Sequence, residues 1–188
     1  MSFANLAERM RPKNLNEFLG QKHLIGEGKV LAQMVKSGQP FSIIFWGPPG
    51  CGKTTLARIL ADSFGADFFN ISAVAAGKSD LSKILAKAQI NLDYGKRTML
   101  FIDEIHRWNK AQQDTLLPYV EKGIITLIGA TTENPSFSIN SALLSRTKVF
   151  VFNQHTKEDI SDFLKKVVKK EYPNYKISKK ILDLIADL

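Results

Sequence analysis

Short apolar runs alternate along this chain with segments in which apolar residues recur every three or four positions. The runs predict five strands, at residues 41–46, 67–72, 98–102, 124–128 and 148–152. Helical periodicity predicts helices around them, at residues 29–36, 55–64, 79–92 and 110–122. Because strands that alternate with helices form a parallel sheet covered on both faces, the pattern predicts an α/β three-layer sandwich with a five-stranded parallel sheet.

The same pattern divides the chain into three regions. Residues 1–28 have little periodicity and are expected to form a structured segment that lies on the core. Residues 29–154 hold the strands and helices of the sheet. Residues 155–188 carry two further amphipathic helices, the first after a capping box formed by Thr156 and Asp159 and the second up to Leu188. This last region is expected to be the beginning of a truncated helical domain.

The first strand leads into a glycine-rich loop. Its eight residues fit the pattern G-x-x-x-x-G-K-[ST] at every fixed position: Gly47, Pro48, Pro49, Gly50, Cys51, Gly52, Lys53 and Thr54. Glycines let backbone N–H groups turn inward, and the N-terminus of the next helix adds positive potential, so such a loop binds phosphate. Lys53 is expected to reach the β- and γ-phosphates, and Thr54 to ligate Mg²⁺. A chance match by a glycine-rich turn is the alternative to a nucleoside triphosphate site.

Two acids, Asp103 and Glu104, follow the apolar run at 98–102. If that strand lies next to the nucleotide strand, both carboxylates reach the γ-phosphate, because ligands bind at the carboxyl ends of parallel strands. Asp103 is then expected to hold Mg²⁺ through water, and Glu104 to orient and polarise the attacking water. The alternative is a solvated start of a loop. Together with the phosphate loop, the acids favour hydrolysis.

Later segments supply further candidates. Thr131 and Thr132 follow the fourth strand, where a hydroxyl can contact the γ-phosphate or the attacking water; a plain loop is the alternative. Arg146 is either a surface charge or an arginine that stabilises the transition state in a neighbouring subunit, and spacing does not decide between these. His106 is expected to pack or to sense DNA rather than to catalyse. Trp108 is expected to pack on the core rather than to stack on a base.

Composition adds a class of partner and excludes several kinds of protein. Lys and Arg number 26 against 18 Asp and Glu, so the formal net charge of +8 suits DNA or RNA without demanding either. Four lysines are either DNA contacts or a solvated helix face: Lys165, Lys166, Lys169 and Lys170. The single cysteine excludes an internal disulfide and a multi-cysteine zinc site. No apolar run is long enough for a membrane span or a signal core, so a cytoplasmic location is expected.

Four longer stretches carry a family resemblance: residues 6–28, 46–59, 101–123 and 127–146. Within them, DEIHRWNKAQQ and GATTENPSF are more specific than the phosphate-loop pattern. The stretches resemble the AAA+ ATPases, more closely the clamp-loader-like branch, and within it the replication-associated recombination protein A family with the Werner-helicase-interacting protein. The resemblance covers essentially the whole chain. It implies a P-loop AAA+ fold in which residues 155–188 begin a helical lid domain.

The resemblance also implies roles at the matched positions. It assigns adenine binding to residues 1–28, through Arg11, Pro12, Gln21, Leu24 and Ile25. It assigns the Walker A contacts to Lys53 and Thr54, with Thr55 beside them. Asp103 and Glu104 match the Walker B acids. Thr132, or as second choice Thr131, falls at sensor 1. Arg146 matches an arginine finger that acts on ATP bound by the neighbouring subunit.

The implied activity is Mg²⁺-dependent, DNA-dependent hydrolysis of ATP by a replication and recombination factor at stalled forks, gaps or DNA ends. The resemblance further implies a tetrameric full-length form, single-strand-binding protein as a partner, and association with the nucleoid. A clamp-loader subunit, a Holliday-junction branch-migration motor and an ATP-switched adaptor that does not hydrolyse are the alternatives. Because the family's sensor 2 arginine and oligomerisation domain lie beyond this chain, it is expected to hydrolyse ATP weakly and to be largely monomeric. Cys51, where threonine is usual, is expected to make the loop sensitive to thiol reagents.

Overall fold

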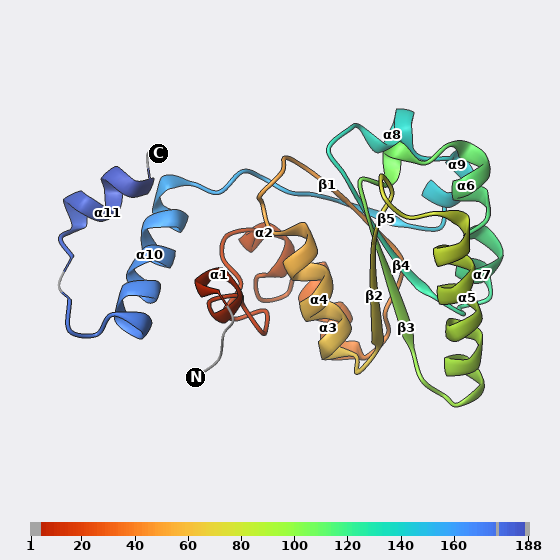
Figure 1. Ribbon diagram of the computed structural model, residues 1–188, viewed down its shortest axis with the longest axis horizontal. Helices are drawn as coiled ribbons and strands as arrows, with labels where there is room; N and C mark the ends of the chain where they lie inside the picture. The colour runs from red at the N-terminus through yellow and green to blue at the C-terminus, as the bar shows by residue number, and fades with distance from the viewer. Residues whose placement is uncertain (1–4, 176, 187–188) are drawn as a thin grey trace.

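Five strands form one parallel sheet in the order β2-β3-β4-β1-β5 (Figure 1). The computed structural model describes residues 5–175 and 177–186. The strands are β1 Ile43–Trp46, β2 Asp67–Ser72, β3 Thr98–Asp103, β4 Thr126–Thr131 and β5 Lys148–Val151. The predicted five-stranded parallel sheet is therefore confirmed.

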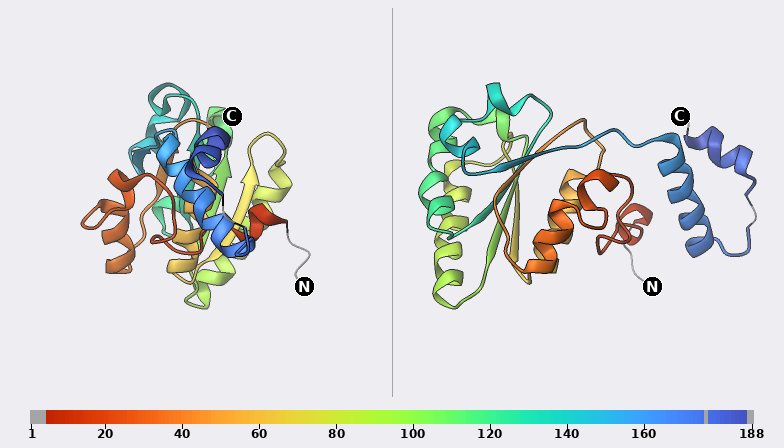
Figure 2. Two further views of the ribbon diagram at one scale, coloured as in Figure 1. Left: turned by 90° about the vertical axis from the view of Figure 1, so that its left-hand side faces the viewer. Right: turned by 180° about the vertical axis from the view of Figure 1, so that it is seen from behind.

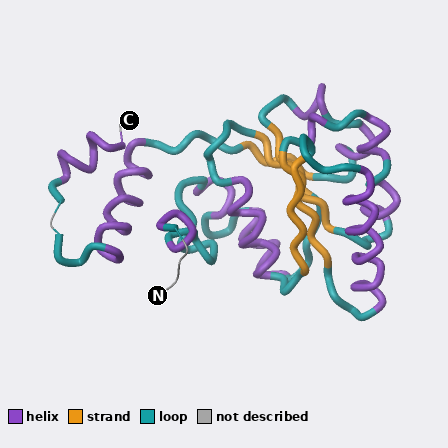
Figure 3. Tube along the Cα trace, viewed as in Figure 1, coloured by secondary structure: helices purple, strands orange, loops and turns teal. Residues whose placement is uncertain are grey.

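Helices cover both faces of this sheet, which makes the predicted three layers (Figure 3). One face is covered by α3 (Val30–Ser37) and α4 (Lys53–Ser63). The other face is covered by α5 (Lys78–Asp93), α6 (Lys110–Asp114), α7 (Leu117–Glu121), α8 (Pro135–Ser138) and α9 (Ser141–Leu144). A 3₁₀ turn, η1 (Ile105–Arg107), connects β3 to the second group.

Each face of the sheet has its own hydrophobic core, because successive strand residues point to opposite faces. In β3, Met99 and Phe101 belong to the core that includes α4. Leu100 and Ile102 belong to the core that includes α5. These four side chains are at most 1% exposed, so β3 is a central strand buried on both sides.

Four helices lie outside the sandwich: α1 (Leu6–Arg9), α2 (Lys22–Ile25), α10 (Lys157–Glu171) and α11 (Lys179–Ala186). α10 and α11 pack against each other at the end of the molecule away from the sheet (Figure 2). The predicted capping box is confirmed, because Asp159 N–H donates to Thr156 Oγ1 at 3.1 Å and Thr156 N–H donates to Asp159 Oδ2 at 3.0 Å. An ion pair of 2.6 Å between Arg9 and Glu171 joins the N-terminal segment to α10. Leu188, the predicted end of the second amphipathic helix, lies outside the described residues.

The single helix predicted at residues 110–122 is wrong. The chain forms α6 and α7 there, with a break at Thr115 and Leu116. Pro118 is the physical reason: proline has no N–H to donate to the carbonyl of Asp114, and its ring crowds the preceding turn.

The fourth strand also differs from its predicted bounds of 124–128, since β4 begins at Thr126 and continues to Thr131. Gly129 lies inside it, where a Cβ atom would come within 2.8 Å of Ile44 Cδ1 and 3.1 Å of Ile105 Cδ1. A glycine that looks like a strand terminator in sequence is thus a close-packing position within a central strand.

Among the described residues, no helix has the length and apolar character to cross a membrane.

Candidate functional site

The candidate site lies at the edge of the sheet where β1, β4 and β3 end. Trp46 of β1 pairs with Thr131 of β4, and Gly129 of β4 pairs with Ile102 of β3. β4 therefore lies between the nucleotide strand and the strand that carries the acids. The two strands are therefore not neighbours, but all three strands are parallel, so the residues that follow them still converge at one edge.

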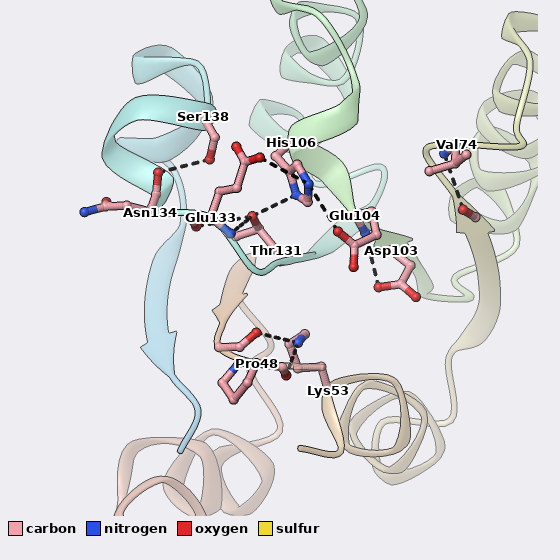
Figure 4. Close-up of polar contacts among 12 residues, drawn as sticks. Pro48, Lys53, Val74, Asp103, Glu104, His106, Thr131, Glu133, Asn134 and Ser138 are labelled. Atoms are coloured by element: carbon pink, nitrogen blue, oxygen red, sulfur yellow. Dashed lines mark hydrogen bonds and ion pairs between the residues drawn. The ribbon is translucent and has the colours of Figure 1, made fainter. Parts of the chain in front are cut away.

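The glycine-rich loop closes around the ammonium group of Lys53. Gly50 and Gly52 have positive φ values of 77° and 95°, which only glycine adopts readily. Lys53 is the first residue of α4, and its Nζ donates to the carbonyl oxygens of Gly47 and Pro48, both at 2.7 Å (Figure 4). Lys53 is only 8% exposed, so the loop places a buried positive charge at the N-terminus of a helix.

A cavity of about 290 Å³ joins this loop to the acids. It is lined by Pro49, Gly50, Gly52, Lys53, Thr54, Thr55, Asp103 and Glu104. One wall combines backbone N–H groups, an ammonium and a helix N-terminus, an arrangement that suits phosphate oxygens. The predicted Walker A residues and both predicted acids therefore share one cavity.

The same cavity holds the oxygen ligands that Mg²⁺ prefers. The Thr54 hydroxyl and the Asp103 carboxylate both line it, and hard oxygen donors of this kind suit Mg²⁺. Within residues 5–175 and 177–186, no cluster of three or more His, Cys, Asp or Glu side chains could hold a metal ion. The residues present therefore fit a Mg²⁺ ion that is completed by phosphate and water oxygens.

The chain turns sharply between the two acids. Asp103 ends β3, and its Oδ1 accepts a hydrogen bond of 3.1 Å from the Glu104 N–H. Glu104 has φ 54° and ψ 42°, the left-handed conformation that is uncommon for a residue other than glycine. This turn directs the Glu104 side chain toward His106 (Figure 4).

His106 connects the end of β3 to the end of β4. Its Nε2 lies 3.2 Å from Glu104 Oε2 and 3.7 Å from Glu133 Oε1, and its Nδ1 lies 3.0 Å from Thr131 Oγ1. Thr131 is completely buried, whereas Thr132 is exposed in the loop that follows. Neither threonine is among the residues that line the phosphate cavity.

Comparison with known proteins decides the family. The model of the ATPase family associated with various cellular activities (AAA) matches residues 43–155. The chain belongs to the AAA family. This membership supports ATPase activity and implies that the cavity at the phosphate loop binds ATP.

Among curated AAA relatives, several share the name implied by the sequence resemblance. The chain is 48% identical over 174 residues to "Replication-associated recombination protein A" of Escherichia coli (strain K12), covering 93% of this chain and 39% of that protein. It is 52% identical to the protein of that name in Coxiella burnetii, covering 90% and 38%. It is 50% identical to "ATPase WRNIP1" of Dictyostelium discoideum, covering 89% and 19%. The chain thus spans less than half the length of these relatives.

Among solved structures, the "Thermotoga maritima RuvB Holliday junction branch migration motor" has a TM-score of 0.76 and 30% sequence identity. The match covers 94% of this chain and 59% of that one. It supports the P-loop AAA+ fold.

A second cavity, of about 280 Å³, adjoins the phosphate cavity of this AAA chain. It is lined by Pro12, Phe18, Leu19, Gly50, Gly52, Thr55, His155, Ile160 and Phe163. Three of these residues, Gly50, Gly52 and Thr55, also line the phosphate cavity. A mostly apolar cavity with a few polar groups beside a phosphate site suits a nucleotide base. Nδ1 of His155 is buried there, without a hydrogen-bond partner in the described part of the chain.

The structure brings only part of the predicted base-binding set to this cavity. Pro12 lines it. Gln21 instead bonds the backbone of Asn153, Leu24 is buried in the core, and Ile25 packs against that core. Arg11 pairs with Glu8 at 3.1 Å and lines a different cavity. Sequence patterns missed Phe18, Leu19, His155, Ile160 and Phe163, because apolar side chains from two distant segments carry no local motif.

Arg146 lies away from the phosphate cavity of its own chain. It precedes β5, whose first residue, Lys148, pairs with Ile43 at the beginning of β1, so it is at the amino edge of the sheet. Its guanidinium pairs with Glu121 at 2.5 Å and donates to the carbonyl of Ala142 at 2.8 Å. Its side chain is 40% exposed, so a neighbouring subunit can reach it.

Cys51 is less accessible than the sequence suggests. Its thiol donates to the Pro48 carbonyl at 2.9 Å, and the residue is 1% exposed. Burial raises the pKa of the Cys51 thiol. Because the thiolate is the reactive form, the expected sensitivity of the loop to thiol reagents is not supported by this environment.

Proposed function

We propose that this chain is the Mg²⁺-dependent ATPase core of a DNA-dependent replication and recombination factor that acts at stalled forks, gaps or DNA ends. One observation carries the enzymatic part: a single cavity is lined by Lys53, Thr54, Asp103 and Glu104. These four residues supply a phosphate-binding cation, two metal ligands and a general base. A binding module that only switches shape with ATP would need the first three but not Glu104.

Each residue has a distinct role in the proposed reaction. The Lys53 ammonium already donates to two carbonyls, and its 3.8 Å contact with Cys51 Sγ is weak enough for a phosphate oxygen to replace it. Mg²⁺ bound at Thr54 and Asp103 supplies positive charge to the phosphate oxygens. Glu104 orients the attacking water and accepts its proton. Thr132 stays the predicted sensor 1 residue, with Thr131 as second choice.

The base is proposed to bind in the apolar cavity, which adjoins the phosphate site. Ile160 and Phe163 of α10 line this cavity. Their position supports a lid role for residues 155–188, next to an N-terminal segment at 1–28 and a core at 29–154. A base held there would join the lid to the core.

DNA as a partner is supported by the net charge of +8 and by the names of the relatives. Of the four lysines singled out on α10, Lys165 pairs with Asp162 at 2.8 Å, whereas Lys166 and Lys170 line a cavity with Arg9. A tetramer, a contact with single-strand-binding protein and a place in the cytoplasm with the nucleoid complete the proposal by family resemblance. The exposed position of Arg146 supports assembly, and this chain alone is proposed to hydrolyse ATP weakly as a monomer.

The test is steady-state ATP hydrolysis by the full-length protein, with no DNA, linear duplex or forked DNA. We expect forked DNA to stimulate the wild type, Lys53→Ala to lose ATP binding, and Glu104→Gln to bind ATP but turn over at least about 10²-fold more slowly. Glu27→Gln is the matched control, since Glu27 is an exposed glutamate away from the cavity. Equal turnover by wild type and Glu104→Gln contradicts the proposed enzyme.

A branch-migration motor is the second candidate, favoured by the structural similarity to RuvB. The same full-length protein can be used to distinguish the two candidate functions, because a branch-migration motor converts a four-way junction into duplex products. Turnover stimulated by four-way junctions with strand exchange supports the second candidate, and stimulation by forks without strand exchange supports the first.

A further inference from the structure

The strongest unassigned feature of the site is the side chain of His106. It is only 3% exposed, and both ring nitrogens face polar groups of the site edge (Figure 4). Nε2 faces Glu104 Oε2 at 3.2 Å, and Nδ1 faces Thr131 Oγ1 at 3.0 Å. A residue expected from sequence to pack or to sense DNA thus connects the proposed general base to the strand between the acids and the phosphate loop.

The 3.2 Å contact between Nε2 and Glu104 Oε2 is attractive when Nε2 carries a hydrogen, because a carboxylate oxygen only accepts. The Thr131 hydroxyl accepts from the Glu133 N–H at 3.0 Å and lies 3.3 Å from the Glu133 carbonyl. Nδ1 accepts from this hydroxyl when the ring is neutral and donates to it when the ring is charged. With its hydrogen on Nε2, the neutral ring presents an N–H toward Glu104, and the charged ring pairs with Glu104 as a cation.

Glu104 needs such a partner because little else restrains its side chain. Its backbone is in the left-handed region, and its side chain is 33% exposed. Glutamate loses considerable rotamer freedom when it is held in one conformation. The contact of His106 Nε2 with Oε2 restrains the carboxylate and leaves Oε1 able to take a proton from water.

We propose that His106 is a positioning residue for ATP hydrolysis, which holds the Glu104 carboxylate and joins it through Thr131 to the end of β4. This inference rests on the ATPase function proposed above. Glu133 extends the network, since its Oε1 is 3.7 Å from His106 Nε2 and its backbone holds the Thr131 hydroxyl. A displacement of the loop after β4 therefore changes the position of the general base.

A purely structural histidine makes a different prediction. If His106 only fills space, its replacement lowers the free energy of unfolding and leaves turnover of the folded protein unchanged. If it positions Glu104, its replacement lowers kcat while the affinity for ATP is retained, because Glu104 acts on water rather than on the bound nucleotide.

Two amide variants separate the contacts of the ring. Gln carries its N–H at about the position of Nε2, so His106→Gln keeps a donor for Glu104. Asn carries its amide at about the position of Nδ1, so His106→Asn keeps a partner for Thr131 and loses the donor to Glu104. We expect His106→Asn to lower kcat by about 10–10²-fold with ATP affinity within about twofold of wild type, and His106→Gln to stay within about threefold.

Thr131→Val provides an independent variant that keeps the shape of the side chain and removes its hydroxyl. We expect kcat to fall by at least about fivefold without loss of ATP affinity, because His106 then loses the partner that fixes its ring. If His106→Asn does not fold, as judged by its unfolding temperature and its binding of a fluorescent ATP analogue, unchanged kcat in Thr131→Val still overturns the inference.

The assays use the full-length protein with its stimulating DNA, and wild type and Glu104→Gln are run beside the variants. If wild type does not turn over, or Glu104→Gln is as fast as wild type, the proposed function fails and this inference fails with it. If those two behave as proposed, three results overturn the inference alone. They are unchanged or raised kcat in His106→Asn, an equal fall in His106→Asn and His106→Gln, and unchanged kcat in Thr131→Val.

Discussion

Gln21 offers the most direct test of how the apolar cavity proposed to bind the base is held together. Its side chain makes two reciprocal bonds with the backbone of Asn153: Nε2 donates to the carbonyl at 2.7 Å, and Oε1 accepts from the N–H at 3.0 Å. Gln21 is 6% exposed and stands at φ 50°. It joins the segment that carries Phe18 to the linker that carries His155, which are two walls of the cavity.

Replacing Gln21 with Leu keeps the approximate volume and removes both bonds. A buried polar group without a partner costs about 1–3 kcal/mol, and here the carbonyl and the N–H of Asn153 both lose their partner. Because Asn153 is exposed, water satisfies these groups in part, so we expect the free energy of unfolding to fall by about 2–4 kcal/mol. For a chain of this size that corresponds to a fall in unfolding temperature of roughly 5–12 °C. We also expect weaker ATP binding, because the two walls are no longer joined.

Thermal unfolding followed by circular dichroism and titration with a fluorescent ATP analogue measure the two effects. Gln33→Leu is the matched control. The side-chain amide of Gln33 donates one hydrogen bond of 3.1 Å to the carbonyl of Gly28, and this hydrogen bond lies at an exposed position. Its cost should stay within about 0.5 kcal/mol. The reasoning is refuted if Gln21→Leu unfolds within the range of this control and binds ATP like wild type.

Three further predictions concern single residues. Cys51 should be alkylated slowly by iodoacetamide in the native protein and faster in the unfolded protein, because burial raises the pKa of its thiol. Equal alkylation rates in both states would contradict this. His155→Leu should change the ratio of ATP to GTP affinity by about fivefold, the value of one hydrogen bond, in a competition assay; an unchanged ratio excludes a base contact by Nδ1. In the full-length protein, Arg146→Ala and Glu104→Gln should each abolish most turnover, and a mixture of the two should regain part of it; a mixture as inactive as its components excludes action between subunits.

Those features of the fold that depend on local pattern were predictable from the sequence. The five strands follow from apolar runs, and Asp67–Ser72 was predicted with the bounds that the structure has. The phosphate loop is local as well, because its glycines, lysine and threonine act within one turn of backbone. The break between α6 and α7 was missed because Pro118 lies inside an apolar stripe whose period continues across it.

The base cavity was not predictable in the same way. Its walls come from residues near 12–19, the phosphate loop, His155 and α10, which are far apart in the sequence and are brought together by the fold. The family resemblance assigns adenine binding to residues 1–28 and favours Gln21, Leu24 and Ile25, none of which lines this cavity. In the structure Gln21 and Leu24 hold the segment in place, and the side chains that face the cavity are their apolar neighbours.

The strand order explains why the end of β4 matters for chemistry. Because β4 lies between β1 and β3, any group at its carboxyl end is close to both the phosphate loop and the acids. A large charged side chain there would compete with phosphate for Lys53 or with water for Glu104. A buried threonine avoids both effects, since its hydroxyl is satisfied by the Glu133 backbone and the His106 ring. The same order that separates the nucleotide strand from the acids thus places between them a neutral group, which connects through His106 to Glu104, the proposed general base.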